Sequence, residues 1–244
     1  MGAVLGVGTT SAAAYWTAMS SYSQALGPFP YRGRTEERTI ALTFDDGPNE
    51  PYTTQIADEL SRHDARATFF QVGRCVERHP DVTANLAAAG HTIGNHSLSH
   101  ELHRCVRRTD LVDEVDANQR ILTERLGRRP ALYRPPWLLR TPALFEILAG
   151  HSLTPVSGEF CHAAEFAQPS PERIARRALA KARPGAILIF HDGFDGRGGD
   201  RANTVAAVRL VMQRLVRDGY TFATVDELLG VAPYRDPATP PAPT

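Results

Sequence analysis

Between Thr39 and Leu229 the chain alternates short apolar runs, which are typical of buried strands, with longer amphipathic stretches of helical periodicity. The expected strands are Thr39–Phe44, Ala67–Val72, His91–Asn95, Ala131–Arg134, Ser152–Val156, Ala186–His191 and Thr221–Val225. The expected helices are Tyr52–His63, Asp81–Ala89, Asp110–Leu126, Thr141–Ala149, Pro171–Ala182 and Thr204–Asp218, with a short final turn at Asp226–Leu229. About seven β-α units in this order predict an α/β fold with one parallel sheet covered by helices.

Periodicity alone fits a closed barrel and an open doubly wound sheet equally well. Both folds place their active-site residues at the carboxyl ends of the strands. Residues with catalytic potential do follow the expected strands: Asp45 and Asp46 follow the first, His96 the third, Arg134 ends the fourth and His191 ends the sixth. We therefore expect one site at the carboxyl edge of the sheet.

The composition sets limits on function. Hydrophobic residues make up 42% of the 244 residues, which is enough for a single α/β domain with a substantial core. The formal net charge is zero, so the strongly basic surface that a nucleic-acid partner requires is not expected. Cys75, Cys105 and Cys161 form no CxxC motif, and we expect three buried thiols, with a Cys75–Cys105 bridge as the alternative.

The two ends of the chain differ from its middle. The first 31 residues carry no charged side chain, and residues 1–20 are moderately apolar, yet they lack a positive leading region and are too polar for a convincing membrane span. We expect residues 1–38 to form an N-terminal extension, either a signal or anchor remnant or a flexible linker. Residues 39–232 should form the folded domain, and the Pro-rich residues 233–244 a flexible or extended tail.

Two motifs predict a metal centre. Asp45 and Asp46 lie between a strand and a Gly-Pro turn, which allows both carboxylates to reach one cavity. His96 and His100 have i,i+4 spacing, which places two imidazoles on one face of a helical turn. Together with Asp46 they form a His-His-Asp set with open coordination positions, which zinc accepts, and also cobalt or nickel. Such a metal lowers the pKa of bound water from about 15.7 to roughly 7.

Two further segments complete the candidate site. Arg134 carries a permanent charge and would hold Asp45 ionised and oriented, and Trp137 in the same RPPW segment offers a flat apolar wall of the kind on which sugar rings stack. His191 ends a buried strand and is a candidate general acid. The Gly-rich segment Gly193–Asp200 matches no phosphate-binding pattern, and we interpret it as a mobile loop beside the site.

Together these segments resemble the polysaccharide deacetylases, the carbohydrate esterases of family 4 with a NodB homology domain. The motifs are TFDDGP at Thr43–Pro48, HSLSH at His96–His100, RPPW at Arg134–Trp137 and FHDG at Phe190–Gly193. They occur in the family's order and approximate spacing, and the resemblance covers about Thr39 to Leu229. It implies a distorted, incomplete (β/α) barrel and the hydrolysis of N-acetyl, sometimes O-acetyl, groups on a glycan.

The resemblance also implies a role for each residue at the matching positions. Asp45 corresponds to the catalytic base and His191 to the acid, and Arg134 to the residue that orients the base. The implied metal ligands are Asp46, His96 and His100. Ile189 falls where the family places an aliphatic residue against the acetyl methyl group. Tyr133 and Trp137 are expected to contribute to substrate binding, with a backbone N–H near Tyr133–Arg134 or Asp46–Gly47 stabilising the oxyanion.

One segment departs from the family's pattern. The family has a DxxDW segment, whereas the best match here is His162–Phe166, so that Glu165 replaces the Asp that tunes the catalytic His and Phe166 replaces the Trp. Glu is one methylene longer, and Phe lacks the indole donor. The chain therefore departs from the family's pattern at the acyl pocket, and the neighbouring His162 and Cys161 are further candidates for the site.

The function expected from the sequence is a metal-dependent deacetylase of a polysaccharide such as peptidoglycan or a chitin-like polymer, acting outside the cytoplasm or at the cell envelope. A cytoplasmic location is the alternative. The altered 162–166 segment also permits an amidohydrolase of a small non-glycan amide. A non-catalytic glycan-binding module is the third hypothesis, but it predicts the loss of catalytic residues that are all present.

Overall fold

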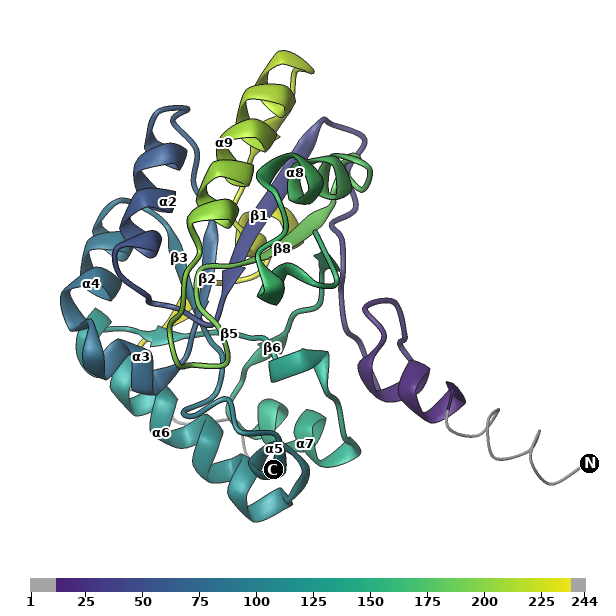
Figure 1. The fold of residues 1–244 in the computed structure, drawn as a ribbon. Coiled ribbons are helices and arrows are strands. Elements are labelled where there is room, and N and C mark those ends of the chain that lie inside the picture. The colour runs from purple at the N-terminus through teal and green to yellow at the C-terminus, as the bar shows by residue number, and fades with distance from the viewer. Residues whose placement is uncertain (1–11, 238–244) are drawn as a thin grey trace, which may run out of the picture.

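The computed structural model describes residues 12–237, in which a curled parallel sheet has helices on its outside (Figure 1). The strands of the main sheet are β1 (Thr39–Asp45), β2 (Thr68–Gln71), β3 (Thr92–Asn95), β5 (Leu132–Tyr133), β6 (Thr154–Pro155), β7 (Glu159–Phe160), β8 (Ile187–His191) and β9 (Thr221–Phe222). Their order is β6-β5-β3-β2-β1-β8-β7, and β9 pairs with the start of β1.

The sheet confirms the expected α/β class and the distorted barrel. Every strand pairing within it is parallel. Strands β6 and β7 stand at the two ends of the order and do not pair with each other in the described chain, so the barrel is incomplete. Because all strands run the same way, their carboxyl ends meet at one edge.

The helices pack around the outer face of the sheet (Figure 1). They are α2 (Tyr52–Ser61), α3 (Gly73–Arg78), α4 (Pro80–Ala88), α5 (Leu102–Val106), α6 (Arg108–Leu126), α7 (Pro142–Gly150), α8 (Pro171–Leu179), α9 (Ala202–Arg217) and α10 (Val225–Leu229). The main core lies between the helices and the sheet. Phe44 of β1 stacks there on Phe69 of β2 and on Phe190 of β8, with ring centroids 5.0 and 5.8 Å apart.

The predicted strands and helices are present, with shifts of a few residues at their ends. The short helices α3 and α5 and the two-residue strands β4 (Arg129–Pro130), β7 and β10 (Tyr234–Arg235) were not predicted. Elements this short show no periodicity in sequence, because tertiary pairing and not local pattern defines them. Strand β10 pairs antiparallel with β4 and so ties the start of the Pro-rich tail to the domain.

The part of the N-terminal extension that the structure describes lies against the domain. Residues 12–19 are helical, and Ser23 and Phe29 are buried. Residues 1–11, where an export element was one of the expectations, lie outside the described part. Among the residues from 12 to 237, no helix combines the length and apolar character needed to cross a membrane.

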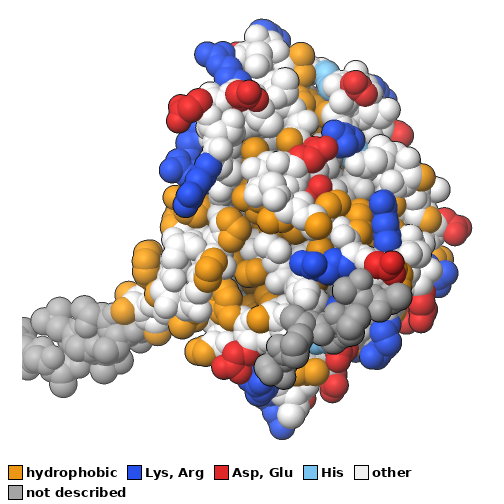
Figure 2. Space-filling model, turned by 180° about the vertical axis from the view of Figure 1, so that it is seen from behind, with side chains coloured by type: hydrophobic (Ala, Val, Ile, Leu, Met, Phe, Trp, Pro, Cys, Tyr) orange, Lys and Arg blue, Asp and Glu red, His pale blue; other side chains and the backbone are white. Residues whose placement is uncertain are grey.

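The thiols agree with the expectation of three buried cysteines. Cys75, Cys105 and Cys161 are free and buried, so the alternative of a Cys75–Cys105 bridge is wrong. On the face shown in Figure 2, Lys and Arg side chains are interspersed with Asp and Glu, and hydrophobic side chains gather beside the N-terminal segment. This face has no continuous basic surface.

Candidate active site at the carboxyl edge of the sheet

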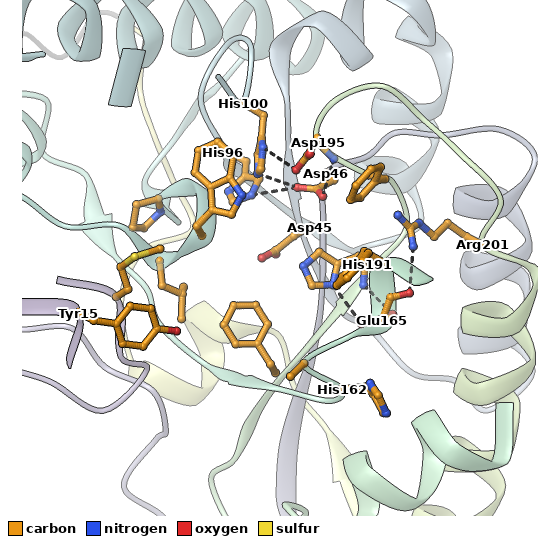
Figure 3. A pocket seen from close by; sticks show the side chains of 18 residues that line it. Tyr15, Asp45, Asp46, His96, His100, His162, Glu165, His191, Asp195 and Arg201 are labelled. Carbon is orange, nitrogen blue, oxygen red and sulfur yellow. Dashed lines mark hydrogen bonds and ion pairs between the residues drawn. The ribbon is translucent and has the colours of Figure 1, made fainter. Parts of the chain in front are cut away.

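A cavity of about 490 Å³ opens at the carboxyl ends of β1, β3 and β8 (Figure 3). Its lining includes predicted site residues and others that the sequence did not suggest. The lining residues are Tyr15, Met19, Asp45, Asp46, His96, His100, Pro135, Trp137, Leu138, Phe160, His162, Ala163, Glu165, Phe166, His191, Phe194, Asp195 and Arg201. The predicted clustering at strand ends is therefore present, since β1 ends at Asp45, β8 ends at His191 and His96 directly follows β3.

Asp46, His96 and His100 converge on one point. The Oδ1 atom of Asp46 lies 3.3 Å from Nε2 of His96 and 3.1 Å from Nε2 of His100. All three side chains are buried, and their ligand atoms lie within 4.8 Å of one another. Burial raises the pKa of Asp46, but the two imidazoles outweigh it and hold that pKa well below its usual value. The Asp46 carboxylate is therefore ionised at neutral pH.

The outer nitrogen of each histidine faces an oxygen atom of a neighbouring residue. Nδ1 of His96 donates to the carbonyl oxygen of Arg134 at 2.6 Å, which leaves the Nε2 lone pair facing Asp46. Nδ1 of His100 lies 3.4 Å from Oδ1 of Asp195. Nε2 of both histidines faces Oδ1 of Asp46, a buried carboxylate oxygen that has no hydrogen-bond partner in the described chain. Two imidazole nitrogens and one carboxylate oxygen are ligands that zinc and similar ions bind, so this buried set fits a divalent metal.

Asp195 is a site residue that sequence reasoning missed. Besides facing His100, it donates its backbone N–H to Oδ2 of Asp46 at 3.0 Å. It therefore touches two of the three candidate ligands from the loop after β8. The available signal was an acidic residue within a Gly-rich segment just past the FHDG motif, which we interpreted only as a loop beside the site.

The helical turn expected for His96–His100 is wrong. These residues form a loop after β3, in which Ser97 and His100 have positive φ angles of 68° and 58°. Asn95 Oδ1 accepts the Ser97 N–H at 2.9 Å, and Ser97 Oγ accepts the His100 N–H at 3.1 Å. These local bonds replace helical ones and still bring both imidazoles to Asp46. Left-handed backbone at non-glycine residues is typical of functional sites.

Asp45 points into the same cavity but has a different partner. Its Oδ1 accepts a hydrogen bond from Nη1 of Arg134 at 2.7 Å, and both side chains are buried. The same guanidinium donates to Thr43 Oγ1 at 2.7 Å and to the carbonyl oxygen of Ser157 at 2.8 Å, and it lies over the Phe70 ring. Burial lowers the pKa of Arg134, and the charge of Asp45 opposes this. Arg134 is thus fixed on several sides and can orient Asp45.

Glu165, which is buried, pairs with His191, whose side chain is partly exposed to the cavity. Nδ1 of His191 lies 3.0 Å from Oε2 of Glu165, and Oε1 of Glu165 accepts the backbone N–H of His191 at 3.2 Å. Burial lowers the pKa of His191, but the hydrogen bond to Glu165 and its charge raise it to about 9. The expected contact between residue 165 and His191 is therefore made by Glu.

Two glycines of the motifs allow the loops after β1 and β8 to approach closely. A Cβ atom on Gly47 would lie 2.0 Å from Oδ2 of Asp192, and one on Gly193 would lie 2.4 Å from the carbonyl oxygen of Asp46. Asp192 is buried and accepts from Thr53 Oγ1 at 2.5 Å. Any side chain at either glycine would therefore push apart the loops that carry the candidate ligands and acid.

Of four further predicted residues, Trp137, Phe166 and His162 line the cavity and Cys161 does not. Trp137 lines it with its ring 4.3 Å from that of His100, and Phe166 lines it while 61% exposed, stacked 6.3 Å from Phe194. His162 also lines the cavity, whereas Cys161 belongs to the main core.

Two of the residues expected to contact substrate, Tyr133 and Ile189, do not line the cavity. The Tyr133 side chain is fully buried in a second core cluster with Val115 and Leu148, and it does not line the cavity. Ile189 packs against Leu138 and Phe160, which do line the cavity, and so lies behind its surface. Side chains alternate along a strand, so Tyr133 and its neighbour Arg134 point to opposite faces. Ile189 is two residues before His191 and shares its face of β8, but Leu138 and Phe160 lie between it and the cavity.

The Arg134 backbone N–H was one candidate donor for the oxyanion. It donates to the carbonyl oxygen of Asn95 at 3.0 Å, because the chain still pairs with β3 at this point. It is therefore not free to bind a substrate oxygen.

Comparisons with known proteins show which family the chain belongs to. Residues 32–156 match the family model of the polysaccharide deacetylases. The chain is 35% identical over 195 residues to a peptidoglycan-N-acetylglucosamine deacetylase of Bacillus cereus, which covers 79% of this chain and 89% of that protein. It is 31% identical over 193 residues to a chitooligosaccharide deacetylase of Azorhizobium caulinodans, covering 75% of this chain and 91% of that protein.

The fold also matches solved structures. A peptidoglycan N-acetylglucosamine deacetylase crystallised with 4-naphthalen-1-yl-N-oxidanyl-benzamide superposes with a TM-score of 0.78. The two sequences are 26% identical, and the match covers 84% of this chain and 94% of the other. Motifs, site geometry and similarity together show that this chain belongs to the polysaccharide deacetylase family.

Proposed function

We propose that this protein is a metal-dependent hydrolase that removes N-acetyl groups from an N-acetylglucosamine polymer, with peptidoglycan or a chitin-like glycan as substrate. One observation carries the proposal: the two adjacent carboxylates after β1 have different partners. Asp46 faces His96 and His100, whereas Asp45 is bound by Arg134 and stays outside the ligand set. A hydrolase that needs a metal site and a separate base requires this division.

Asp46, His96 and His100 would hold the metal, and we propose Zn²⁺, with Co²⁺ or Ni²⁺ as alternatives. When bound, such an ion supplies a Lewis acid that polarises a carbonyl and lowers the pKa of water. The hydrogen bond to the Arg134 carbonyl oxygen fixes the orientation of the His96 imidazole, and the Asp195 carboxylate faces the outer nitrogen of His100.

Asp45 is suited to accept the proton of the attacking water. Arg134 occupies its Oδ1, and no hydrogen bond within the described chain engages Oδ2, so that oxygen is free to face the substrate. A carboxylate held by a fixed guanidinium loses little orientational freedom when it reacts. The water oxygen then attacks the acetyl carbonyl carbon.

His191 stands ready to protonate the leaving nitrogen. Its Nδ1 is held by Glu165, so Nε2 is the nitrogen that can donate to the substrate. With its pKa at about 9, the imidazole is protonated at neutral pH. Transfer of this proton to the amide nitrogen breaks the C–N bond, and the products are acetate and a free amino sugar.

The alternative of a small non-glycan amide rested on the altered 162–166 segment. Glu165 makes the contact to His191 that the alteration placed in doubt, so this reason for the alternative is weakened. The names of the relatives, deacetylases of peptidoglycan and of chitooligosaccharides, support a glycan and an extracytoplasmic or cell-envelope location.

The proposal is tested by acetate release from peptidoglycan and from chitin oligomers, with and without a chelator. We expect release from at least one glycan, its loss on chelation and its recovery when Zn²⁺, Co²⁺ or Ni²⁺ is added back. Release from small linear or cyclic amides, with none from either glycan, would favour the alternative.

A further inference from the structure

The N-terminal segment contributes to the wall of the catalytic cavity. Tyr15 and Met19 line the same cavity as Asp45 and His191, although they lie outside the residues matched by the family model. Figure 3 shows Tyr15 and Glu165 on opposite sides of this cavity, with Asp45 and His191 between them. Tyr15 is 63% exposed, so its ring is available to a ligand that fills the cavity.

A buried arginine fixes the segment in place. Arg140 is 2% exposed, and its guanidinium donates to the carbonyl oxygens of Ser20 at 2.8 Å and Thr17 at 2.9 Å. Its backbone N–H donates to the carbonyl oxygen of Ala18 at 2.8 Å. The last carbonyls of a helix lack partners within it and carry partial negative charge, so a cation at this end is well placed. Arg140 thus caps the helix of residues 12–19.

Contacts further along the segment hold it against the edge of the sheet. Ser157 Oγ donates to the carbonyl oxygen of Ser21 at 2.8 Å, and the Tyr22 hydroxyl donates to Oε2 of Glu159 at 3.0 Å. Phe29 packs in a buried cluster with Leu138, which itself lines the cavity. The position of Tyr15 is therefore set by several independent contacts made by the chain that follows it.

We propose that Tyr15 is a stacking platform for a sugar ring of the glycan next to the ring being deacetylated. This inference rests on the proposed function and names a subsite for its substrate. A tyrosine ring offers an apolar face and a polar tip, and a pyranose ring offers an apolar C–H face bordered by hydroxyls. A side chain with two rotatable bonds on an anchored helix also loses little entropy on binding.

Trp16 provides a matched comparison on the same helix. It is 53% exposed but is not among the cavity-lining residues of the described chain. If the exposed aromatic side chains bound a lipid surface, replacing Trp16 would weaken that binding at least as much as replacing Tyr15, because tryptophan is favoured at membrane interfaces. If they bind a glycan in the cavity, replacing Tyr15 should weaken glycan binding and replacing Trp16 should not.

The test is steady-state kinetics on N-acetylglucosamine oligomers of two to six sugars. We expect Tyr15→Ala to raise KM by about tenfold for the longest oligomer, with a smaller rise as the oligomer shortens. Tyr15→Phe should recover most of the loss, and Trp16→Ala should change KM by less than about twofold. Arg140→Met should reproduce the length-dependent loss and increase protease cleavage within residues 12–30, because the segment loses its anchor.

Equal changes in KM at all lengths, or no change in Tyr15→Ala, would overturn the inference. It would also be overturned if Trp16→Ala weakened binding to anionic phospholipid vesicles while Tyr15→Ala left the KM series unaltered. Failure of the proposed function has a separate signature, which is the absence of acetate release from every glycan by the unaltered protein. In that case calorimetric binding of the six-sugar oligomer decides: weaker binding by Tyr15→Ala supports the subsite, and equal binding overturns it.

Discussion

Glu165 holds His191 by two atoms at once: Oε2 lies 3.0 Å from Nδ1 of the ring, and Oε1 accepts the backbone N–H at 3.2 Å. The hydroxyl of Thr204 donates to the same Oε1 at 2.9 Å, which fixes the carboxylate from the side of α9. The short 3₁₀ turn Glu165–Ala167 carries this side chain. The pair forms one unit that fixes the orientation and the charge of the imidazole.

Glu165→Gln should shift the pH dependence of catalysis. Burial favours neutral His191, and Glu165 is the main group that opposes it and raises the pKa to about 9. Without the charge, the pKa falls, so the protonated acid is lost at lower pH. We expect the alkaline limb of the kcat profile to move down by about one pH unit or more.

This shift is read from pH–rate profiles of the unaltered protein and the variant. Glu172→Gln, at an exposed position on α8, is the matched control and should leave the profile in place. An unchanged alkaline limb in Glu165→Gln would mean that His191 is not the titrating acid.

Asp195→Asn should weaken metal binding without removing a ligand. The carboxylate faces Nδ1 of His100 at 3.4 Å, and such outer partners make metal-binding imidazoles more basic. Replacing it by a neutral amide should lower the metal affinity by about 10- to 100-fold, measured by competition with a fluorescent chelator. Asp200→Asn in the same loop is the control and should retain the affinity. If both variants bind the metal equally well, Asp195 has no such role.

His91 should make the fold sensitive to acid. Its ring is buried, and its Nδ1 accepts the backbone N–H of Ala67 at 3.2 Å. Burial, with a smaller effect of the Arg66 charge, lowers the pKa from 6.5 to about 4. The unfolded chain therefore binds a proton that the folded chain does not, and stability falls as pH drops from about 6.5 to about 4. The loss from this group approaches about 3 kcal/mol.

Urea unfolding between pH 7 and pH 4.5 measures this effect. His91→Gln keeps an acceptor for Ala67 but cannot titrate, so its free energy of unfolding should fall less steeply with pH than that of the unaltered protein. His103→Gln, at a side chain that is 73% exposed, is the control and should keep the original slope. Parallel slopes for all three proteins would show that His91 does not contribute.

The sequence predicts the centre of the site better than its edges. Asp45, Asp46, His96, Arg134 and His191 could be placed together because a parallel sheet brings the ends of its strands to one edge. The residues that meet them from elsewhere could not be placed in this way. Asp195 reaches His100 only because the loop after β8 folds back, and Tyr15 only because Arg140 anchors its helix.

The sequence pattern also did not predict the local conformation of some segments. The His96–His100 spacing suggested a helical turn, but hydrogen bonds from Asn95 and Ser97 select a loop that achieves the same convergence. Tyr133 and Ile189 are next to site residues in sequence or strand register, yet both are fully buried away from the cavity surface. Whether a side chain reaches the cavity depends on its direction and on the residues packed in front of it, which a motif does not specify.

The division of labour between Asp45 and Asp46 is the central claim, and one paired measurement tests it most directly. Bound metal and acetate release are measured on the same samples of Asp45→Asn and Asp46→Asn. Asp45→Asn should keep near-normal metal content while its turnover falls by about 10²- to 10⁴-fold, the usual contribution of a general base. Asp46→Asn should lose the metal and the activity together. Asp45→Asn retaining most of its turnover, or losing its metal as Asp46→Asn does, would contradict the account.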